Sequence, residues 1–268
     1  MKRVLTAFAA LAAAAAFADG VSSSNIVGYN TVELPNQYTV LGVNFNGIGG
    51  GELSLQDAVP YVAGMTKGNN IASADQIQIQ NVSSGGYDTY YMSNGKNAKG
   101  ATVSGLEGKW AKGGTTTPTE VTITSGQAFW YIRKSTDTTL SLTLAGEVGV
   151  LASADEPIDL TYKLIANPYP VDLPLNDGIP YVTGMTKGNN IASADQIQIQ
   201  NATGGYDTYY MSNGKNAKGN TVDGLEGKWA VAGSTTKATA SIPAGKGAWF
   251  IRKGSTDFAI TIARPYSL

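Results

Sequence analysis

The chain has 268 residues, enough for two domains of ordinary size, and it contains neither cysteine nor histidine. These absences exclude disulfide bonds, thiolate chemistry, Ser-His-Asp triads and histidine-ligated metal centres. The 19 basic and 20 acidic residues give a net charge of −1, so electrostatics supply no reason to expect nucleic acid or an anionic membrane as a partner. We therefore predict a protein that is not an enzyme and that holds no cofactor.

The first residues have the features of a bacterial-type signal peptide. Lys2 and Arg3 precede an apolar, alanine-rich run over residues 4–17, which is too short to span a bilayer. Ala16 and Ala18 occupy the two positions that a signal peptidase reads. Cleavage after residue 18 would leave 250 of the 268 residues. We expect a mature chain without a membrane span, secreted or held at the surface of a bacterial cell.

The mature chain contains one module written twice. Residues 61–81 match residues 181–201 at 20 of 21 positions, and residues 85–110 match residues 204–229 at 24 of 26 positions. Self-similarity of this extent predicts two copies of one fold.

The ends of the two copies are less sharply defined. Upstream, Leu-Gly-Val-Asn at 41–44 aligns with Leu-Ile-Ala-Asn at 164–167. Glycine, alanine and acidic residues gather near residues 148–156 without apolar alternation. We therefore place the signal peptide at 1–18, module 1 at 19–148 and module 2 at 149–268.

Short alternating strands dominate both modules. Ile77 and Ile79 alternate with glutamines, a Ser-Gly turn follows, and residues 87–92 return, which predicts a β-hairpin. The strand at Trp130 is apolar on both faces and is predicted to be central. A helical turn near residues 54–59, with Ser54 as N-cap, is the one helix expected in this copy. The predicted fold is all-β: two tandem β-sandwich or barrel-like modules, each with at most one short helix.

Across its two modules the chain carries the short motifs Leu164-x-x-Asn167-Pro168, Gly86-Tyr87-x-x-Tyr90, Gly108-Lys109-Trp110, Pro243-x-Gly245 before Trp249, and the closing Leu142-x-Leu144-Ala-Gly-Glu-Val148. It resembles, in these motifs, uncharacterised β-modules of secreted proteins from environmental Gram-negative bacteria. The resemblance implies export and β-architecture, and it carries no functional residues. Module 1 departs from the pattern at Phe45 and Thr124, where prolines are expected, and module 2 ends without Gly-Glu-Val.

Three carboxylates recur in each module. Asp75, Asp88 and Glu107 return as Asp195, Asp207 and Glu226. They lack the Asp-x-Asp spacing of a calcium loop, so no metal site is predicted. A glycosidase would need two of them at a defined separation, and two copies would put two active sites in one chain. A carboxylate-based glycoside-active enzyme is therefore the weakest alternative.

The hairpin offers the candidate binding surface. We expect Asp88 to point to solvent, which by alternation turns Tyr90 outward and Tyr87 and Tyr91 inward. An exposed tyrosine beside two amides suits sugar recognition, although similar cross-strand pairs decorate sheets that bind nothing. The candidate ligand-binding residues are Gln78, Gln80, Asp88, Tyr90, Gln198, Gln200, Asp207 and Tyr209.

Two functional hypotheses follow. The first is a structural or adhesive extracellular protein whose two near-identical surfaces give avidity and whose strand edges allow self-association. The second is a protein that binds extracellular polysaccharide through the tyrosine and glutamine face. The long polar segment 92–109 is a loop of the length that is usually functional or mobile. Its repetition fits a shared surface role, and it fits recent duplication equally well.

Overall fold

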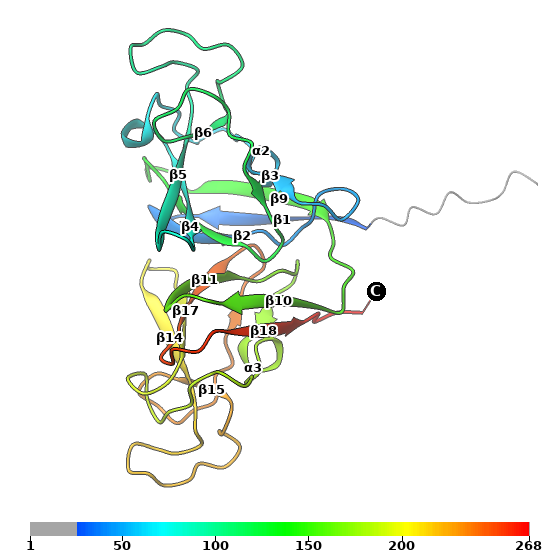
Figure 1. Cartoon of the computed structure of the whole chain (residues 1–268), viewed down its shortest axis with the longest axis vertical. Coiled ribbons are helices and arrows are strands. Elements are labelled where there is room, and N and C mark those ends of the chain that lie inside the picture. The colour runs from blue at the N-terminus through cyan, green and yellow to red at the C-terminus, as the bar shows by residue number, and fades with distance from the viewer. Residues whose placement is uncertain (1–25, 268) are drawn as a thin grey trace, which may run out of the picture.

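The computed structural model describes residues 26–267, and the predicted signal peptide lies outside this range. Strands β1 to β9 form module 1 and strands β10 to β18 form module 2, stacked along the long axis (Figure 1). Module 1 comprises β1 (Val27–Leu34), β2 (Tyr38–Gly42), β3 (Leu53–Ser54), β4 (Gln76–Asn81), β5 (Gly86–Met92), β6 (Trp110–Lys112), β7 (Thr122–Ile123), β8 (Ala128–Ile132) and β9 (Leu140–Glu147). Module 2 comprises β10 (Ser153–Ile158), β11 (Tyr162–Ala166), β12 (Leu173–Pro174), β13 (Gln196–Gln200), β14 (Tyr206–Met211), β15 (Trp229–Val231), β16 (Ser241–Ile242), β17 (Gly247–Ile251) and β18 (Phe258–Ala263).

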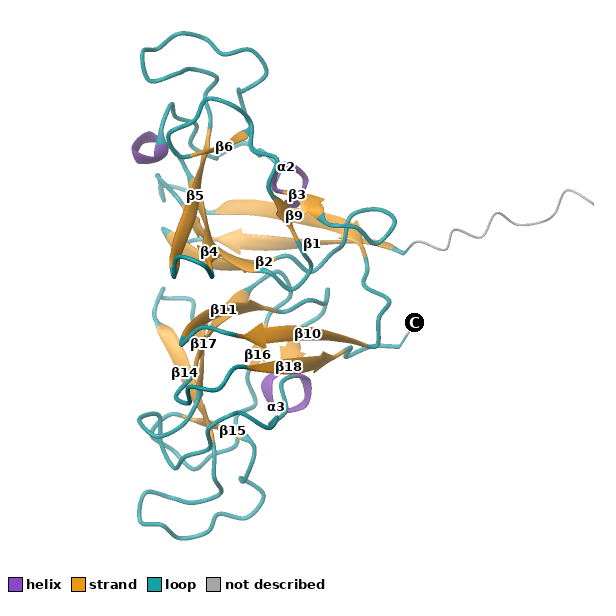
Figure 2. Cartoon of the chain, viewed as in Figure 1, coloured by secondary structure: helices purple, strands orange, loops and turns teal. Residues whose placement is uncertain are grey.

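Each module is built from antiparallel sheets in the same arrangement. The larger sheet of module 1 has the strand order β2-β8-β4-β5-β6, and that of module 2 has the matching order β11-β17-β13-β14-β15. Two-stranded sheets accompany them: β1-β9 and β3-β7 in module 1, β10-β18 and β12-β16 in module 2. The predicted all-β class and the two similar modules are confirmed (Figure 2). The strand at Trp130, β8, is central as predicted, between β2 and β4.

Helices are short. In module 1, α2 (Leu55–Ala58) begins after Ser54, whose side chain accepts a hydrogen bond from the backbone N–H of Asp57. The predicted helical turn and its N-cap are thus confirmed. A 3₁₀ turn, η1 (Ile71–Ser73), precedes β4, and module 2 has α3 (Leu175–Gly178). No helix within residues 26–267 is long and apolar enough to cross a membrane.

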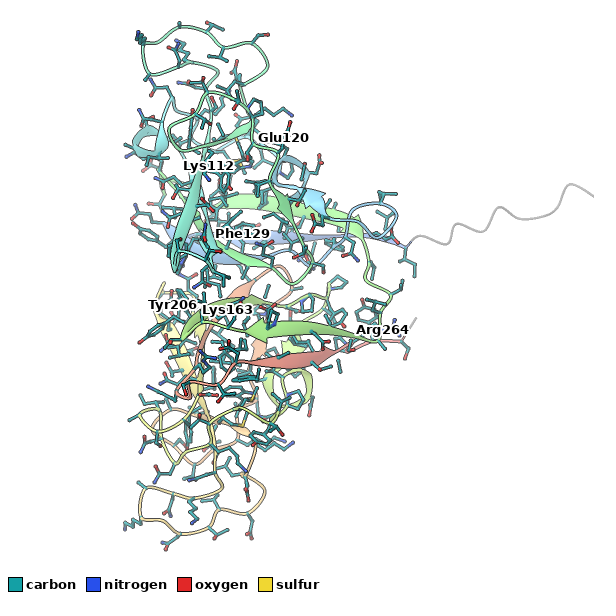
Figure 3. The ribbon with its side chains drawn as sticks, viewed as in Figure 1. Lys112, Glu120, Phe129, Lys163, Tyr206 and Arg264 are labelled. Carbon is teal, nitrogen blue, oxygen red and sulfur yellow. The ribbon has the colours of Figure 1, made fainter. Side chains whose placement is uncertain are left out.

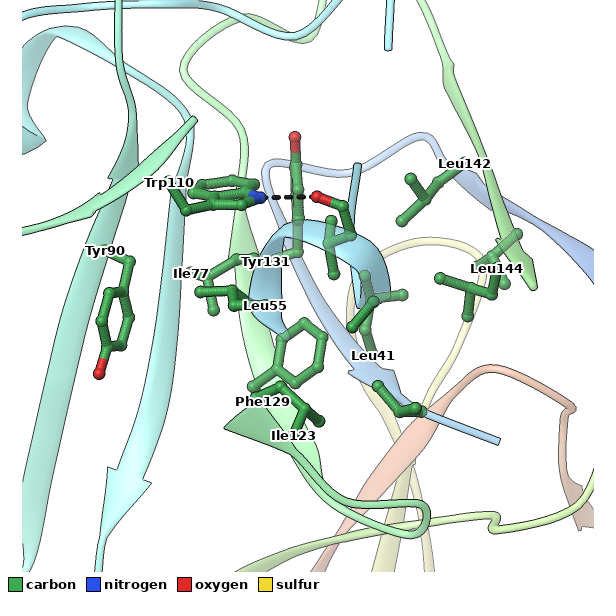
Figure 4. Close-up of a cluster of buried hydrophobic side chains, with 14 of the residues drawn as sticks. Leu41, Leu55, Ile77, Tyr90, Trp110, Ile123, Phe129, Tyr131, Leu142 and Leu144 are labelled. Carbon is green, nitrogen blue, oxygen red and sulfur yellow. Dashed lines mark hydrogen bonds between the residues drawn. The ribbon is translucent and has the colours of Figure 1, made fainter. Parts of the chain in front are cut away.

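Each module has its own hydrophobic core. In module 1 the fully buried Trp110 donates its indole N–H to the carbonyl oxygen of Val59 at 2.6 Å, and its ring meets Tyr131 edge-on (Figure 4). In module 2 Trp229 donates to the carbonyl of Ile179 at 2.7 Å and meets Phe250 in the same way. The two cores are therefore built on one plan.

The structure corrects one part of the internal alignment. Leu41 lies in the core of module 1, and its structural counterpart in module 2 is Ile165, which lies in the core of that module. Leu164, which the sequence aligns with Leu41, faces the other way. The sequence alignment was off by one residue, and such a slip moves every side chain of a strand to the opposite face.

Candidate functional site

The two modules meet along a seam, which we define by the buried cluster Val40, Ala128, Leu164 and Ala166. Val40 and Leu164 come from β2 and β11, the edge strands of the two five-stranded sheets. Hydrogen bonds cross the seam, from the Gly42 N–H to the Gly245 carbonyl at 3.1 Å and from the Asn44 side-chain amide to the Tyr169 carbonyl at 3.4 Å. Apolar burial and hydrogen bonds together join the modules.

Two glutamines, Gln80 and Gln200, each bind the backbone of the other module across the seam, and we call this pair of contacts the clasp. Gln80, at the end of β4, donates from Nε2 to the Tyr162 carbonyl at 2.6 Å and accepts from the Leu164 N–H at 3.0 Å. Gln200, at the end of β13, donates to the Tyr38 carbonyl at 2.7 Å and accepts from the Val40 N–H at 3.4 Å. Each carboxamide thus pairs with the edge strand of the other module as a neighbouring peptide group would.

This clasp revises two expectations. Gln80 and Gln200, predicted to lie in a solvent-facing binding surface, instead bind the other module. The prediction of self-association through exposed strand edges does not extend to these groups of β2 and β11, because the Tyr38 and Tyr162 carbonyls and the Val40 and Leu164 N–H groups bind the glutamines across the seam. Edge strands with free N–H and C=O groups can pair with further strands. Each glutamine occupies such groups on the edge strand of the other module.

The face assignment of the predicted tyrosine was wrong. Tyr90 is 4% exposed and packs in the core of module 1 (Figure 4), and its counterpart Tyr209 is partly buried against the core of module 2. Tyr87, predicted to point inward, is 40% exposed. Tyr91 is buried as predicted, but on the face opposite the core, under the long loop and beside Leu106.

The register of β4 and β5 explains why the face assignment of Tyr90 was wrong. Ile77 pairs with Tyr90 across β4 and β5, so both side chains lie on the core face. Asp88 pairs with Ile79 and lies on that same face, at its rim, where Asn81 and Lys112 contact its carboxylate at 2.9 and 2.8 Å. Placing Asp88 on the solvent face therefore exchanged the two faces of β5 in the prediction, so that Tyr90 was assigned outward and Tyr87 inward.

The recurring carboxylates serve three separate structural purposes. Asp75 is buried and accepts hydrogen bonds from the Lys134 N–H at 2.7 Å and the Tyr131 hydroxyl at 2.9 Å. Asp88 binds Lys112, and this ion pair lowers the pKa of its carboxyl. Glu107 binds Lys67 at 2.6 Å. No group of three acidic side chains converges on a common point within residues 26–267.

Module 2 keeps two of these contacts and varies the third. Asp195 accepts from the Lys253 N–H at 2.7 Å, and Glu226 binds Lys187 at 2.8 Å. Among residues 26–267, Asp207 contacts only Asn201, at 3.2 Å, because Val231 stands where module 1 has Lys112. The contacts common to both modules are therefore those that hold the loops around the sheet.

An aromatic cluster spans the seam, and the sequence reasoning missed it. Trp130 and Trp249, one from each module, have ring centroids 6.1 Å apart. Tyr38 meets Trp130 edge-on at 6.4 Å. Tyr206 lies at the level of the seam (Figure 3), and its pKa is raised by burial and, to a smaller extent, by Tyr87 of the other module. Parts of Tyr38, Tyr87 and Tyr206 remain exposed, at 50, 40 and 37%.

The longest polar segments form what we call the end loops, residues 93–109 and 212–228. They lie at opposite ends of the long axis of the molecule (Figure 1). Internal hydrogen bonds fix their shape: Asn97 Oδ1 accepts from the N–H groups of Lys99 and Ala101, both at 3.0 Å, and Asn216 Oδ1 repeats this pattern. Gly95 has φ +77°, which suits glycine at this turn.

Beneath the end loop of module 2 lies a hollow of about 590 Å³. Its lining includes Asn189, Asn216 and Lys218, with the buried ring of Tyr210. Within residues 26–267, Lys96, Lys99, Lys215 and Lys218 form no ion pair and are exposed. Both ends therefore present asparagine amides and unpaired lysines, and the end loop of module 2 has Asn220 and Asp223 where that of module 1 has Ala101 and Ser104.

No protein-family model, curated protein or solved structure matches this chain.

Proposed function

We propose that the chain is a secreted, non-enzymatic, structural or adhesive protein that acts as a bivalent connector. Its two end loops would bind like partners, one at each end of the molecule. The observation that carries this proposal is the placement of nearly identical polar loops at opposite ends of the long axis (Figure 1). A partner bound at one end leaves the other end free for a second.

Three features support this role. The end loops are held by repeated internal hydrogen bonds, so binding would cost little ordering entropy. The reciprocal glutamines fix one module on the other. Two equal sites on one rigid body gain avidity for a surface that carries many copies of the partner.

The exposed lysines indicate the chemistry of the partner. Lys96 and Lys99 at one end, and Lys215 and Lys218 at the other, stand beside asparagine amides and form no ion pair with the residues that the structure describes. Ammonium groups and carboxamides together suit a polymer that carries carboxylates and hydroxyls. An acidic extracellular polysaccharide is the partner class that we propose for the end loops.

A bridging assay with alginate-coated beads tests the proposal. We expect the wild-type chain to bind and cross-link the beads. The one-ended variant Lys215→Gln/Lys218→Gln should bind without cross-linking, and the variant that also carries Lys96→Gln/Lys99→Gln should do neither. Lys134→Gln/Lys237→Gln, which removes two exposed lysines outside the end loops, is the charge-matched control.

Two results would contradict a connector role. One is cross-linking by the one-ended variant as efficient as that by the wild type. The other is an absence of binding to the beads by all proteins. Sedimentation velocity without beads tests whether the chain binds itself. If the wild type assembles and the lysine substitutions abolish this assembly, the partner of the end loops is a second copy of the chain.

A further inference from the structure

One face of each five-stranded sheet carries no charge along its paired strands. On the face that bears Trp130, a row across the sheet reads Val40, Trp130, Gln78 and Thr89, and the next row includes Gln80 and Tyr87. The corresponding row of module 2 reads Leu164, Trp249, Gln198 and Thr208. Aromatic rings, carboxamides and hydroxyls alternate there without a single acid or base.

These two neutral faces meet at the seam, and their aromatic rings form one group. Trp130 and Trp249 lie 6.1 Å apart, and Tyr87 and Tyr206 pair in register with Gln80 and Gln200, the two glutamines that hold the seam. Tyr38 adds an edge-on contact with Trp130. The cluster is only partly covered, because its tyrosines are exposed by 37–50%.

Side-chain polar groups remain free beside the rings. The amide of Gln78 forms no hydrogen bond within the described part of the chain, whereas Gln80, on the same strand and face, uses both of its amide atoms to hold the seam. Gln198 forms a single long contact, 3.5 Å, to Gln196. The face thus offers donors and acceptors that the fold itself does not use.

We propose that this aromatic cluster binds a neutral polysaccharide chain across the seam, with contacts from both modules. Sugar rings present an apolar face of C–H groups that stacks on aromatic rings, and hydroxyls that pair with carboxamides. The lack of charge on the paired strands selects a neutral polymer over an acidic one. Rings from two modules form a continuous site longer than one sugar unit, which favours a polymer.

This site does not depend on the end loops. The end loops carry lysines and lie at the extremities, whereas the aromatic cluster is uncharged and lies at the seam. Substitutions at one place leave the other intact, so the two proposals can fail separately. The site also keeps Gln78 and Gln198 of the original hypothesis and replaces Tyr90 and Tyr209 with Tyr87 and Tyr206.

The test uses the mature chain, affinity electrophoresis and tryptophan fluorescence, with hydroxyethyl cellulose and galactomannan as neutral probes and alginate as the acidic comparison. Trp110 and Trp229 are fully buried, so a ligand-dependent change in emission reports on Trp130 and Trp249. Tyr87→Ala with Tyr206→Ala removes two rings of the cluster. Tyr29→Ala, which removes a tyrosine that is 77% exposed on β1, is the control.

We expect at least one neutral probe to retard the protein and to shift its emission, with no effect of Tyr29→Ala. Each ring removed should weaken binding about 5-fold, and the pair about 25-fold, at an unchanged melting temperature. The variants altered in the end-loop lysines should bind neutral probes as the wild type does.

Three results would overturn the proposal. One is a lack of retardation by both neutral probes. A second is retardation that the paired tyrosine substitution leaves unchanged. The third is a wild type that dimerises in sedimentation velocity, binds no saccharide, and becomes monomeric in the tyrosine variant, which would make the cluster a contact between copies.

Discussion

Gln80→Leu probes the clasp that joins the modules. The substitution keeps an extended side chain of similar volume and removes two hydrogen bonds, to the Tyr162 carbonyl at 2.6 Å and from the Leu164 N–H at 3.0 Å. A net hydrogen bond contributes about 1 kcal/mol, and leaving a half-buried partner unsatisfied adds to the loss, so we expect a destabilisation of about 2–3 kcal/mol.

Gln78→Leu is the matched control, because Gln78 lies on the same strand and face and forms no hydrogen bond within residues 26–267. Urea denaturation of the full chain gives the change in unfolding free energy. Amide hydrogen exchange locates it, and the Leu164 N–H should exchange faster in Gln80→Leu only. Equal effects of the two substitutions on stability and on Leu164 exchange would refute the clasp.

Three further predictions concern single groups. Phe250→Tyr should place a hydroxyl near Asp195, as Tyr131 does for Asp75, and stabilise module 2 by about 1.5–3 kcal/mol in urea denaturation at neutral pH, whereas Tyr131→Phe should destabilise module 1 by a similar amount. Burial raises the pKa of Glu156 to about 7, so its folded-state pKa exceeds the unfolded value. The contribution of Glu156 to the stability of the fold is therefore present at low pH and is lost as the pH rises from about 4.5 through 7. Thermal melts at pH 5 and pH 8 should show a smaller loss of stability between the two pH values for Glu156→Gln than for the wild type. Intact mass of secreted protein should place the mature N-terminus at Asp19, and an uncleaved Met1 would contradict the signal-peptide prediction.

Local patterns along the chain were sufficient to predict the repeat, the all-β class and the hairpin. The strict alternation around Ile77 and Ile79 identifies a strand whatever it packs against. Ser54 predicts its helical turn because an N-cap acts within three residues. These features depend on short stretches of backbone, so a single sequence is enough to find them.

The face of Tyr90 could have been predicted from the turn. Residues 82–85 form the turn, so Asn81 pairs with Gly86, and counting back places Tyr90 opposite the core residue Ile77. Asp88 misled the assignment because a carboxylate at the rim of a core face can remain hydrated beside Lys112.

The seam could not be predicted in this way. Gln80 and Gln200 contact partners 82 and 162 residues away in the sequence. A glutamine that faces solvent and one that binds the edge of another module give the same polar alternation. The aromatic cluster could not be predicted for the same reason, since Trp130 and Trp249 come together only when the modules dock.

We expect the seam to hold the two end loops in one fixed arrangement. Because the chain has no cysteine, spin labels can be placed uniquely at Lys99→Cys and Lys218→Cys, one in each end loop. Pulsed electron resonance of the doubly labelled protein should give one narrow distance distribution, which broadens when Gln80→Leu and Gln200→Leu are added. A broad distribution in the otherwise unaltered protein would show that the modules move independently and would contradict a rigid, two-ended connector.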